Sequence, residues 1–312
     1  MSGDALLELL RGGARLLMDG ALGTELERHQ LPIEGEGWSA LAVRDHGDTV
    51  SEIHHQYIEA GARLHIANSF ALARHVLEPI GLGADFATLN RRSVELFEAA
   101  VEKAETRRSN YWVAGSISTF AANSDRRLLP TGDALYGNCR DQAELLLDAG
   151  ADLIALEMLF DIEVSRTMLR ALDGLETPVM VGLTCEWESG RAGSVVMHSG
   201  LGFEPVSLES VLPPLLAEID PARSVLAIMH SDIDVTDAAL EIARRYWPGT
   251  LAAYPNSGEF VDLQLQFDSV CDEDEFVQAA CRWLDAGVQI AGGCCGIGPS
   301  HIRRLADACD WS

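Results

Sequence analysis

Short apolar runs alternate with longer amphipathic runs along the 312 residues of this chain. The apolar runs have the length and composition of strands, and the amphipathic runs have the spacing of helices. Strands that are apolar almost throughout and are joined by helices predict a parallel sheet covered on both faces. Eight such strands are predicted, at Arg15–Gly20, Ala62–Ser69, Tyr111–Ile117, Asp152–Met158, Pro178–Cys185, Ser224–His230, Thr250–Asn256 and Val288–Cys295.

Helical patterns fill the segments between the predicted strands. Three of them end in a glycine directly before the next strand, at Gly61, Gly150 and Gly287, which is typical of a helix C-terminus. Eight strand–helix units fit a closed barrel better than an open sheet. No G-x-G-x-x-G follows the first strand, which argues against an open dinucleotide-binding sheet of the Rossmann type. We therefore predict an α/β fold, a (β/α)8 TIM barrel that forms a single domain over residues 1–312. The helices are expected at Ser51–Ala60, Leu89–Thr106, Arg140–Ala149, Ile162–Leu172, Ser207–Glu218, Ala238–Tyr246 and Asp274–Asp285.

Composition excludes several classes of protein. The net charge of −25 argues against nucleic acid as a partner, because phosphate binding needs a basic surface. No apolar window of about 20 residues exists, so no membrane span is expected, and the N-terminus lacks the pattern of a signal peptide. Seven cysteines at irregular spacing argue against a disulfide framework and for a reducing compartment, so we expect a cytoplasmic protein. The sequence does not fix the oligomeric state, and a homo-oligomer stays open.

Polar residues gather where the predicted strands end, which is where barrel enzymes place their active sites. Asp19–Gly20 ends the first strand, Asn68 lies near the end of the second, and Glu157 lies near the end of the fourth. Each residue could instead cap a following helix, and Glu157 could pair with an arginine such as Arg63 or Arg166. Their joint position around the barrel mouth favours a binding site.

The adjacent Cys294 and Cys295, within Gly292–Gly296, are the most specific chemical feature. A disulfide between neighbouring cysteines is strained, whereas two thiols at a strand end are suitable soft metal ligands. The glycines let the backbone turn both sulfurs toward one point. The other interpretation is a pair of small buried residues, and the residues alone leave both open. Four of the other cysteines are expected to be packing residues, namely Cys139, Cys271, Cys281 and Cys309. The fifth, Cys185, lies near the rim of the barrel and is a further candidate ligand.

Several stretches together resemble the homocysteine S-methyltransferase family, and the resemblance covers nearly the whole chain. The last two stretches are long and specific, and the order of all of them along the chain is the family's order. The stretches are Met18–Glu25, Ala67–Phe70, Gly115–Ile117, Ala149–Ile154 with Glu157, Tyr254–Glu259 and Gly292–Ile302.

The resemblance implies a barrel with a catalytic zinc ion that three cysteines hold. Cys294 and Cys295 match two of them, but His230 stands where the family has the third cysteine. Zinc accepts a set of two cysteines and one histidine with an open fourth position, so His230, Cys294 and Cys295 are the predicted Zn²⁺ ligands and catalytic residues. Imidazole reaches farther than a thiolate, so the backbone or the metal has to adjust. Asp232 or Asp234 could orient the imidazole or cap the next helix.

By the same resemblance, the chain transfers a methyl group from a small donor to the zinc-bound thiolate of homocysteine, giving methionine. S-methylmethionine, S-adenosylmethionine and a betaine-like ammonium compound all fit as donors. Asp19, Gly20, Asn68 and Glu157 are the expected substrate-binding residues. Aromatic residues in loops near the donor side, Trp187, Phe120 and Phe203, could contact an onium methyl group. The alternative is a metal-free barrel of the family that binds or transforms another small molecule, with His230 as an ordinary strand-end histidine.

Overall fold

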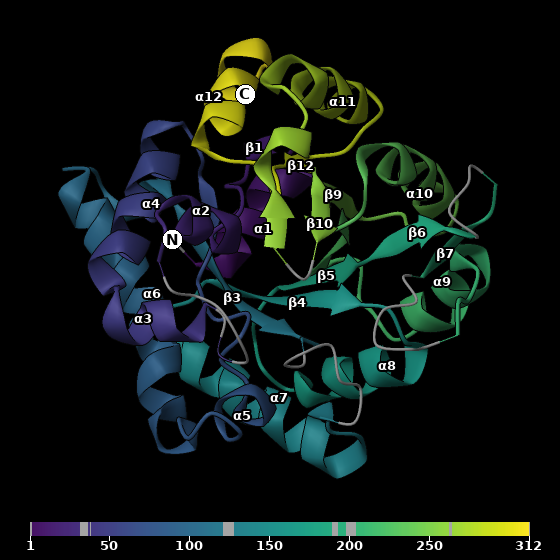
Figure 1. Cartoon of the computed structure of the whole chain (residues 1–312). Coiled ribbons are helices and arrows are strands. Elements are labelled where there is room, and N and C mark those ends of the chain that lie inside the picture. Colours follow the sequence, from purple (N-terminus) through teal and green to yellow (C-terminus); the bar gives the residue numbers. More distant parts are fainter. Residues whose placement is uncertain are drawn as a thin grey trace.

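The computed structural model describes residues 2–31, 37, 39–120, 128–188, 193–197, 204–261 and 264–311. Its centre is a sheet of eight parallel strands with helices around it (Figure 1). Every one of these strands lies within a predicted strand or overlaps it. They are β1 (Leu16–Leu17), β2 (Leu64–Ile66), β3 (Trp112–Ser118), β4 (Leu153–Leu159), β5 (Val179–Leu183), β8 (Ser224–Met229), β9 (Thr250–Tyr254) and β12 (Ile290–Ala291).

The sheet closes on itself to form a barrel. The strand order is β1-β12-β9-β8-β5-β4-β3-β2, and a parallel bridge between Met18 and Leu64 joins the two ends of this order. The Arg63 amide also donates to the Leu17 carbonyl at 2.9 Å. The predicted (β/α)8 TIM barrel is thereby confirmed, and the carboxyl ends of all eight strands lie at one end of it.

Helices surround the barrel, and none of the described helices is both long and apolar enough to cross a membrane. Gly61, Gly150 and Gly287 have φ angles of 100°, 107° and 97°, so the predicted glycine helix ends are confirmed. The helices are α1 (Gly3–Arg11), α2 (Gly23–Arg28), α3 (Ala40–Asp45), α4 (Gly47–Glu59), α5 (Arg74–Leu77), α6 (Phe86–Lys103), α7 (Gly132–Asp148), α8 (Ile162–Ala171), α9 (Leu208–Leu216), α10 (Ile233–Tyr246), α11 (Glu273–Asp285) and α12 (Pro299–Ala308).

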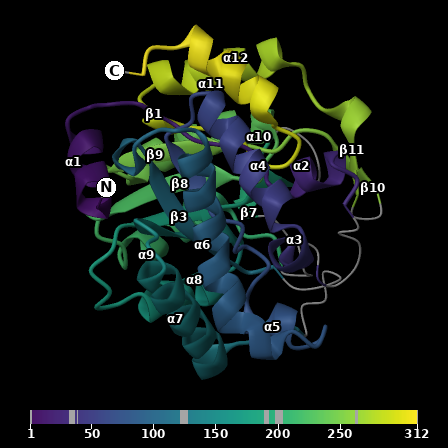
Figure 2. The same ribbon diagram turned by 90° about the vertical axis from the view of Figure 1, so that its left-hand side faces the viewer.

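Helix α1 closes the end of the barrel opposite the carboxyl ends of the strands. Its Leu6 and Leu10 belong to the same buried cluster as Leu16 and Trp112 from the strands. The helix lies at the left-hand end of the barrel in Figure 2. A Cβ atom on Gly3 would lie 2.2 Å from a barrel carbonyl, so the close approach of this helix requires glycine. The interior of the barrel is therefore a packed core, and α1 covers the end opposite the carboxyl ends of the strands.

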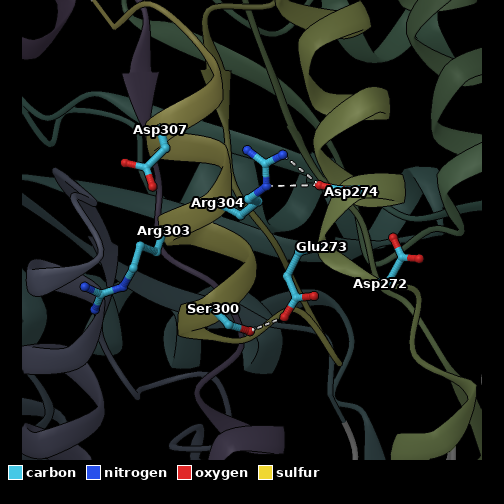
Figure 3. Close-up of a pocket in the computed structure, with 7 residues that line it drawn as sticks. All are labelled: Asp272, Glu273, Asp274, Ser300, Arg303, Arg304 and Asp307. Carbon is cyan, nitrogen blue, oxygen red and sulfur yellow. Dashed lines mark hydrogen bonds and ion pairs between the residues drawn. The ribbon is translucent and has the colours of Figure 1, made fainter.

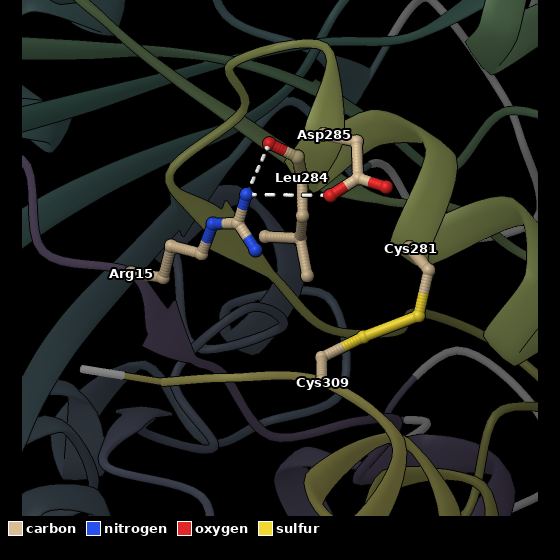
Figure 4. The surroundings of a disulfide bond; sticks show 5 residues. All are labelled: Arg15, Cys281, Leu284, Asp285 and Cys309. Atoms are coloured by element: carbon tan, nitrogen blue, oxygen red, sulfur yellow. Dashed lines mark hydrogen bonds and ion pairs between the residues drawn. A yellow bond between two sulfur atoms is a disulfide. The ribbon is translucent and has the colours of Figure 1, made fainter.

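A disulfide bond joins Cys281 of α11 to Cys309, which follows α12 (Figure 4). The expectation that both residues only pack is therefore wrong. The prediction failed because the sequence does not reveal that α12 packs along α11, which brings the two Cα atoms to 6.5 Å. Among the described residues, Cys139, Cys185, Cys271, Cys294 and Cys295 are free thiols.

Removing this disulfide is expected to lower the free energy of unfolding. The bond closes a loop with a sequence separation of 28 residues. In the chain-entropy model such a loop corresponds to about 3.5 kcal/mol. We expect Cys309→Ser to lose about this amount in urea unfolding under oxidising conditions. With a thiol reductant present, the wild type and the variant should unfold at nearly the same urea concentration. A wild type that does not respond to reductant would contradict the assignment.

Candidate active site

His230, Cys294 and Cys295 meet at the open end of the barrel. His230 directly follows β8, and the two cysteines follow β12, with β9 between these strands in the sheet. The His230 Nδ1 atom lies 3.6 Å from Cys294 Sγ and 3.7 Å from Cys295 Sγ, and the two sulfurs are 3.9 Å apart. The three side chains that the sequence selected as metal ligands thus form one nearly equilateral triangle of donor atoms.

The loop that carries the cysteines is held by backbone hydrogen bonds. The Cys294 amide donates to Pro255 O at 2.7 Å, and Cys295 O accepts from the Ser257 amide at 2.8 Å. Gly296 has a φ of 83°, and a Cβ atom there would lie 2.2 Å from Ser257 O. Only glycine tolerates both conditions, so the glycine after the cysteines fixes the turn that directs both sulfurs to the same point.

The backbone of His230 is unusual for a residue with a side chain. Its φ angle is 44°, in the left-handed region, and its amide donates to Tyr254 O at 3.2 Å. Asp232 is the residue before α10, whereas Asp234 accepts a hydrogen bond from the Trp187 indole at 2.8 Å. Asp234 therefore fixes the loop that follows β5, and Asp232 is the acidic neighbour whose charge acts on the imidazole.

The triangle has the dimensions that zinc requires. Bonds of about 2.0–2.1 Å to nitrogen and about 2.3 Å to sulfur, at tetrahedral angles, place N and S donors about 3.6 Å apart and two S donors about 3.8 Å apart. The three distances of this site agree with these values to within about 0.1 Å. The donor set therefore fits a Zn²⁺ ion with an open fourth position, which leaves room for a substrate atom.

The electrostatics of the triangle also favour a cation. The hydrogen bond with Cys295, together with burial, raises the pKa of the Cys294 thiol well above its ordinary value. Burial lowers the pKa of His230, but the hydrogen bond to Cys294 and the charges of Cys294, Asp232 and Glu157 outweigh it, so the net shift is upward. Two adjacent thiolates without a compensating positive charge are therefore unfavourable, and a bound cation would supply that charge.

Two buried carboxyl groups lie at the same end of the barrel. Asp19 Oδ2 accepts a hydrogen bond from the Ile66 amide at 3.0 Å, while Oδ1 has no hydrogen-bond partner among the described residues. Glu157 accepts a hydrogen bond from the Ser116 hydroxyl. Burial is the main cause that raises the pKa of both carboxyl groups, and the charge of Glu157 raises that of Asp19 further.

The simpler interpretation of Glu157 as an ion-pair partner finds no support. Arg166 pairs instead with Glu163 and Glu218, and Arg63 donates to a backbone carbonyl. A buried carboxylate without an arginine partner is unfavourable, unless a positively charged ligand approaches it.

Asn68 and Gly20 complete the set of predicted substrate-binding residues. Asn68 is buried, and its side-chain Nδ2 has no hydrogen-bond partner among the described residues, so a donor remains for a ligand. A Cβ atom on Gly20 would lie 2.2 Å from Ile297 O and 2.9 Å from the Tyr57 hydroxyl. Gly20 is thus required for close packing between the loop after β1 and the loop that carries the cysteines.

A model of the family described as homocysteine S-methyltransferase matches residues 16–309 of the chain. The chain belongs to the homocysteine S-methyltransferase family. It is 29% identical to the homocysteine S-methyltransferase of Escherichia coli (strain K12), over 93% of this chain and 94% of that protein. It is 26% identical to the selenocysteine Se-methyltransferase of Brassica oleracea var. italica, over 96% of this chain and 91% of that protein.

A solved structure of the family agrees with the fold. The metallated form of the homocysteine methyltransferase MmuM from Escherichia coli superimposes with a TM-score of 0.77 at 27% identity, over 96% of this chain and 98% of that chain. The family resemblance that the sequence motifs indicated is confirmed, and so is the fold.

Two of the three aromatic residues predicted near a methyl donor lie among the described residues. Phe120 packs against Phe70 with ring centroids 5.6 Å apart, and Trp187 is held by Asp234. Phe203 lies outside the described residues.

Cys185 is buried, with a thiol pKa raised to about 12 by burial, and it does not belong to the triangle of donor atoms. Ser116 was not predicted as a site residue, although it lies in the family-like stretch Gly115–Ile117, because its hydrogen bond to Glu157 depends on how β3 and β4 pair.

A surface hollow of about 600 Å³ lies between α11 and α12 (Figure 3). Two pairs of its polar groups bind each other: Arg304 Nε donates to Asp274 at 3.0 Å, and Ser300 donates to Glu273 at 2.8 Å. None of the residues that line it belongs to the triangle or to the predicted substrate-binding set. The hollow is therefore separate from the candidate site at the barrel mouth.

Proposed function

We propose that this protein transfers a methyl group from a small sulfonium or ammonium donor to the thiol of homocysteine, giving methionine. The observation that carries the proposal is the triangle of donor atoms from His230, Cys294 and Cys295, with edges of 3.6, 3.7 and 3.9 Å. A zinc ion held by these residues would lower the pKa of a thiol at its open position, which supplies a thiolate at neutral pH.

The two buried carboxyl groups would bind the amino end of the same substrate. Asp19 Oδ1 and Glu157 are acceptors at the mouth of the barrel, and both suit an ammonium group through charge-assisted hydrogen bonds. Asn68 Nδ2 is an available donor for the carboxylate end. These contacts would fix the amino acid at both ends, so that its sulfur is oriented toward the donor.

Methyl transfer between the two substrates needs little acid–base catalysis. An in-line displacement on the methyl carbon depends mainly on holding the sulfur and the donor in the correct geometry. The donor would enter from the side of the segments that follow β2, β3 and β5, where Phe70, Phe120 and Trp187 lie in that order. Aromatic rings attract onium methyl groups, so S-methylmethionine, S-adenosylmethionine and betaine-like compounds are the donors to be tried first.

Metal analysis and a direct assay test this proposal. The purified protein, treated with zinc and dialysed, should contain close to one zinc ion per chain. With homocysteine and each donor in turn, it should form methionine. A protein that folds without metal and forms no methionine with any donor would contradict the proposal. That result would favour the alternative, a barrel of the family that acts on another small molecule.

The replacement His230→Cys should accelerate methyl transfer if the metal is retained. Two thiolates, a neutral imidazole and Zn²⁺ sum to zero charge, whereas three thiolates and Zn²⁺ sum to −1. The added negative charge should raise the pKa of the substrate thiol by about 1–3 units. With a Brønsted coefficient of about 0.4–0.5, the rate should rise about 3- to 30-fold. Single-turnover rates at equal zinc content measure the effect, and an unchanged rate would refute the charge argument.

A further inference from the structure

A second group of buried polar side chains lies directly behind the amino-acid end of the proposed site. It consists of Asp19, His54 of α4 and His65 of β2, whose ligand-type atoms lie within 4.8 Å of one another. All three side chains are fully buried. The His65 ring packs against Phe97 of α6 with centroids 4.9 Å apart, so it lies between the sheet and the helices. Only Asp19 belongs both to this group and to the proposed substrate-binding set.

The hydrogen bonds of His65 fix its orientation toward Asp19. Its Nε2 lies 3.2 Å from the Ala62 carbonyl, which can only accept, so Nε2 carries a hydrogen. The other ring nitrogen, Nδ1, lies 3.6 Å from Asp19 Oδ2. A neutral ring therefore presents a lone pair to this oxygen. If Asp19 were ionised, two buried acceptor atoms, Asp19 Oδ2 and His65 Nδ1, would face each other without a hydrogen between them, which is unfavourable. A proton on one of the two atoms allows a hydrogen bond instead.

The surroundings place that proton on Asp19 in the substrate-free protein. Burial and the charge of Glu157 raise the pKa of Asp19, and the same burial, together with His54 and Arg108, lowers the pKa of His65. Arg108 itself is paired with Glu98 and Asp152, and the pKa of His54 falls to about 3 through burial, so His54 is neutral. The other titratable groups that face Asp19 or pack on His65 are phenols: Tyr57, Tyr111 and Tyr254.

We propose that His65 is a positioning residue that accepts the Asp19 proton when the amino group of the amino-acid substrate docks on Asp19 Oδ1. The O–H bond of Asp19 breaks, an N–H bond forms at His65 Nδ1, and no proton leaves the protein. Asp19 Oδ2 and Nδ1, 3.6 Å apart, have to approach by about 0.4–0.9 Å to reach hydrogen-bond distance. This inference rests on the proposed function, because it needs an ammonium group at Oδ1.

The charges of the complex favour this transfer. Ionised Asp19 and Glu157, an imidazolium at His65 and the substrate ammonium sum to zero. If the proton left for solvent, the same buried groups would carry a net charge of −1. Uncompensated buried charge is unfavourable. By accepting the proton of Asp19, the neighbouring His65 imidazole keeps the net charge of the occupied site at zero.

Proton counting during methionine binding tests the role of His65. Methionine has the same amino-acid end as homocysteine but no ionisable thiol. Titration calorimetry of the zinc-loaded protein in two buffers of different ionisation enthalpy gives the number of protons released. For the wild type we expect close to zero protons and a Kd that is nearly constant between about pH 6 and 7.5. For His65→Leu we expect up to one proton released and a Kd that weakens by up to about tenfold per unit of falling pH.

The matched control is His54→Leu, which removes an equally buried imidazole that has a ring nitrogen within 4.8 Å of the Asp19 and His65 pair but makes no hydrogen bond among the described residues. It should keep the wild-type proton count and pH dependence. Equal behaviour of His65→Leu and the wild type would overturn the inference, and so would an equal change in both variants. In ¹⁵N-histidine-labelled wild type, methionine should convert one imidazole to the doubly protonated form, and the absence of this change would also overturn it. If methionine does not bind at all, the proposed function itself fails, which is a different result.

Discussion

Cys294→Ser should reduce methyl transfer to homocysteine by at least about 10³-fold. Cys294 contributes one of three donor atoms, and its sulfur lies 3.6 Å from His230 Nδ1. A serine hydroxyl is a poor zinc ligand, so the variant keeps only one sulfur and one nitrogen in the triangle. Metal-assisted stabilisation of charge amounts to several kcal/mol, and about 4 kcal/mol corresponds to a factor of about 10³. Zinc content and initial rates measure the effect together.

The control for this experiment is Cys271→Ser. Cys271 is also a partly buried free thiol, but it does not belong to the triangle. The control should retain zinc and nearly full activity, and both variants should show the circular dichroism of the wild type. If Cys294→Ser had undiminished activity, the thiolate of homocysteine would form without the Cys294 sulfur as a metal ligand. That result would remove the main support for the proposed function.

The strands could be predicted because a parallel barrel buries both faces of each strand. Runs such as Tyr111–Ile117 are apolar except for Ser116, and the observed β3, at residues Trp112–Ser118, differs from that prediction by one residue at each end. Helix starts were less predictable. The predicted start of α10 at Ala238 is five residues late, because its first turn, Ile-Asp-Val-Thr, alternates apolar and polar residues and does not show the periodicity of a helix. Helix α1 was missed, since nothing local shows that Gly3–Arg11 closes a barrel formed far along the chain.

The rule that barrel strands bring their carboxyl ends together predicted a polar site at one end of the barrel. The choice of His230 as partner of the cysteine pair, 64 residues away, came from the family resemblance, in which His230 stands at the position of the third cysteine. Side-chain contacts that depend on which face of a strand a residue occupies could not be predicted from the sequence. The position of His65 behind Asp19 is such a contact, because it depends on how β1 and β2 meet.

Glu157→Gln should weaken the use of homocysteine while leaving the metal in place. Glutamine keeps the shape of the side chain and can still accept the Ser116 hydrogen bond, so the fold should be retained. The variant lacks the negative charge that faces the substrate ammonium. Loss of one partner of a buried charge pair amounts to about 2–5 kcal/mol, which corresponds to about 30-fold to several thousand-fold in kcat/KM. Most of the change should appear in KM.

The pH dependence separates this role from a merely structural one. Burial raises the pKa of Glu157 above its ordinary value, and only the ionised form attracts the ammonium group. In the wild type, kcat/KM should therefore fall as the pH falls through this raised pKa. Glutamine does not titrate, so the variant should lose the part of the acid limb that Glu157 causes, at unchanged zinc content. A variant that keeps the wild-type KM and the full acid limb would show that Glu157 does not bind the amino group, and Asp19 would then be the remaining carboxylate for that contact.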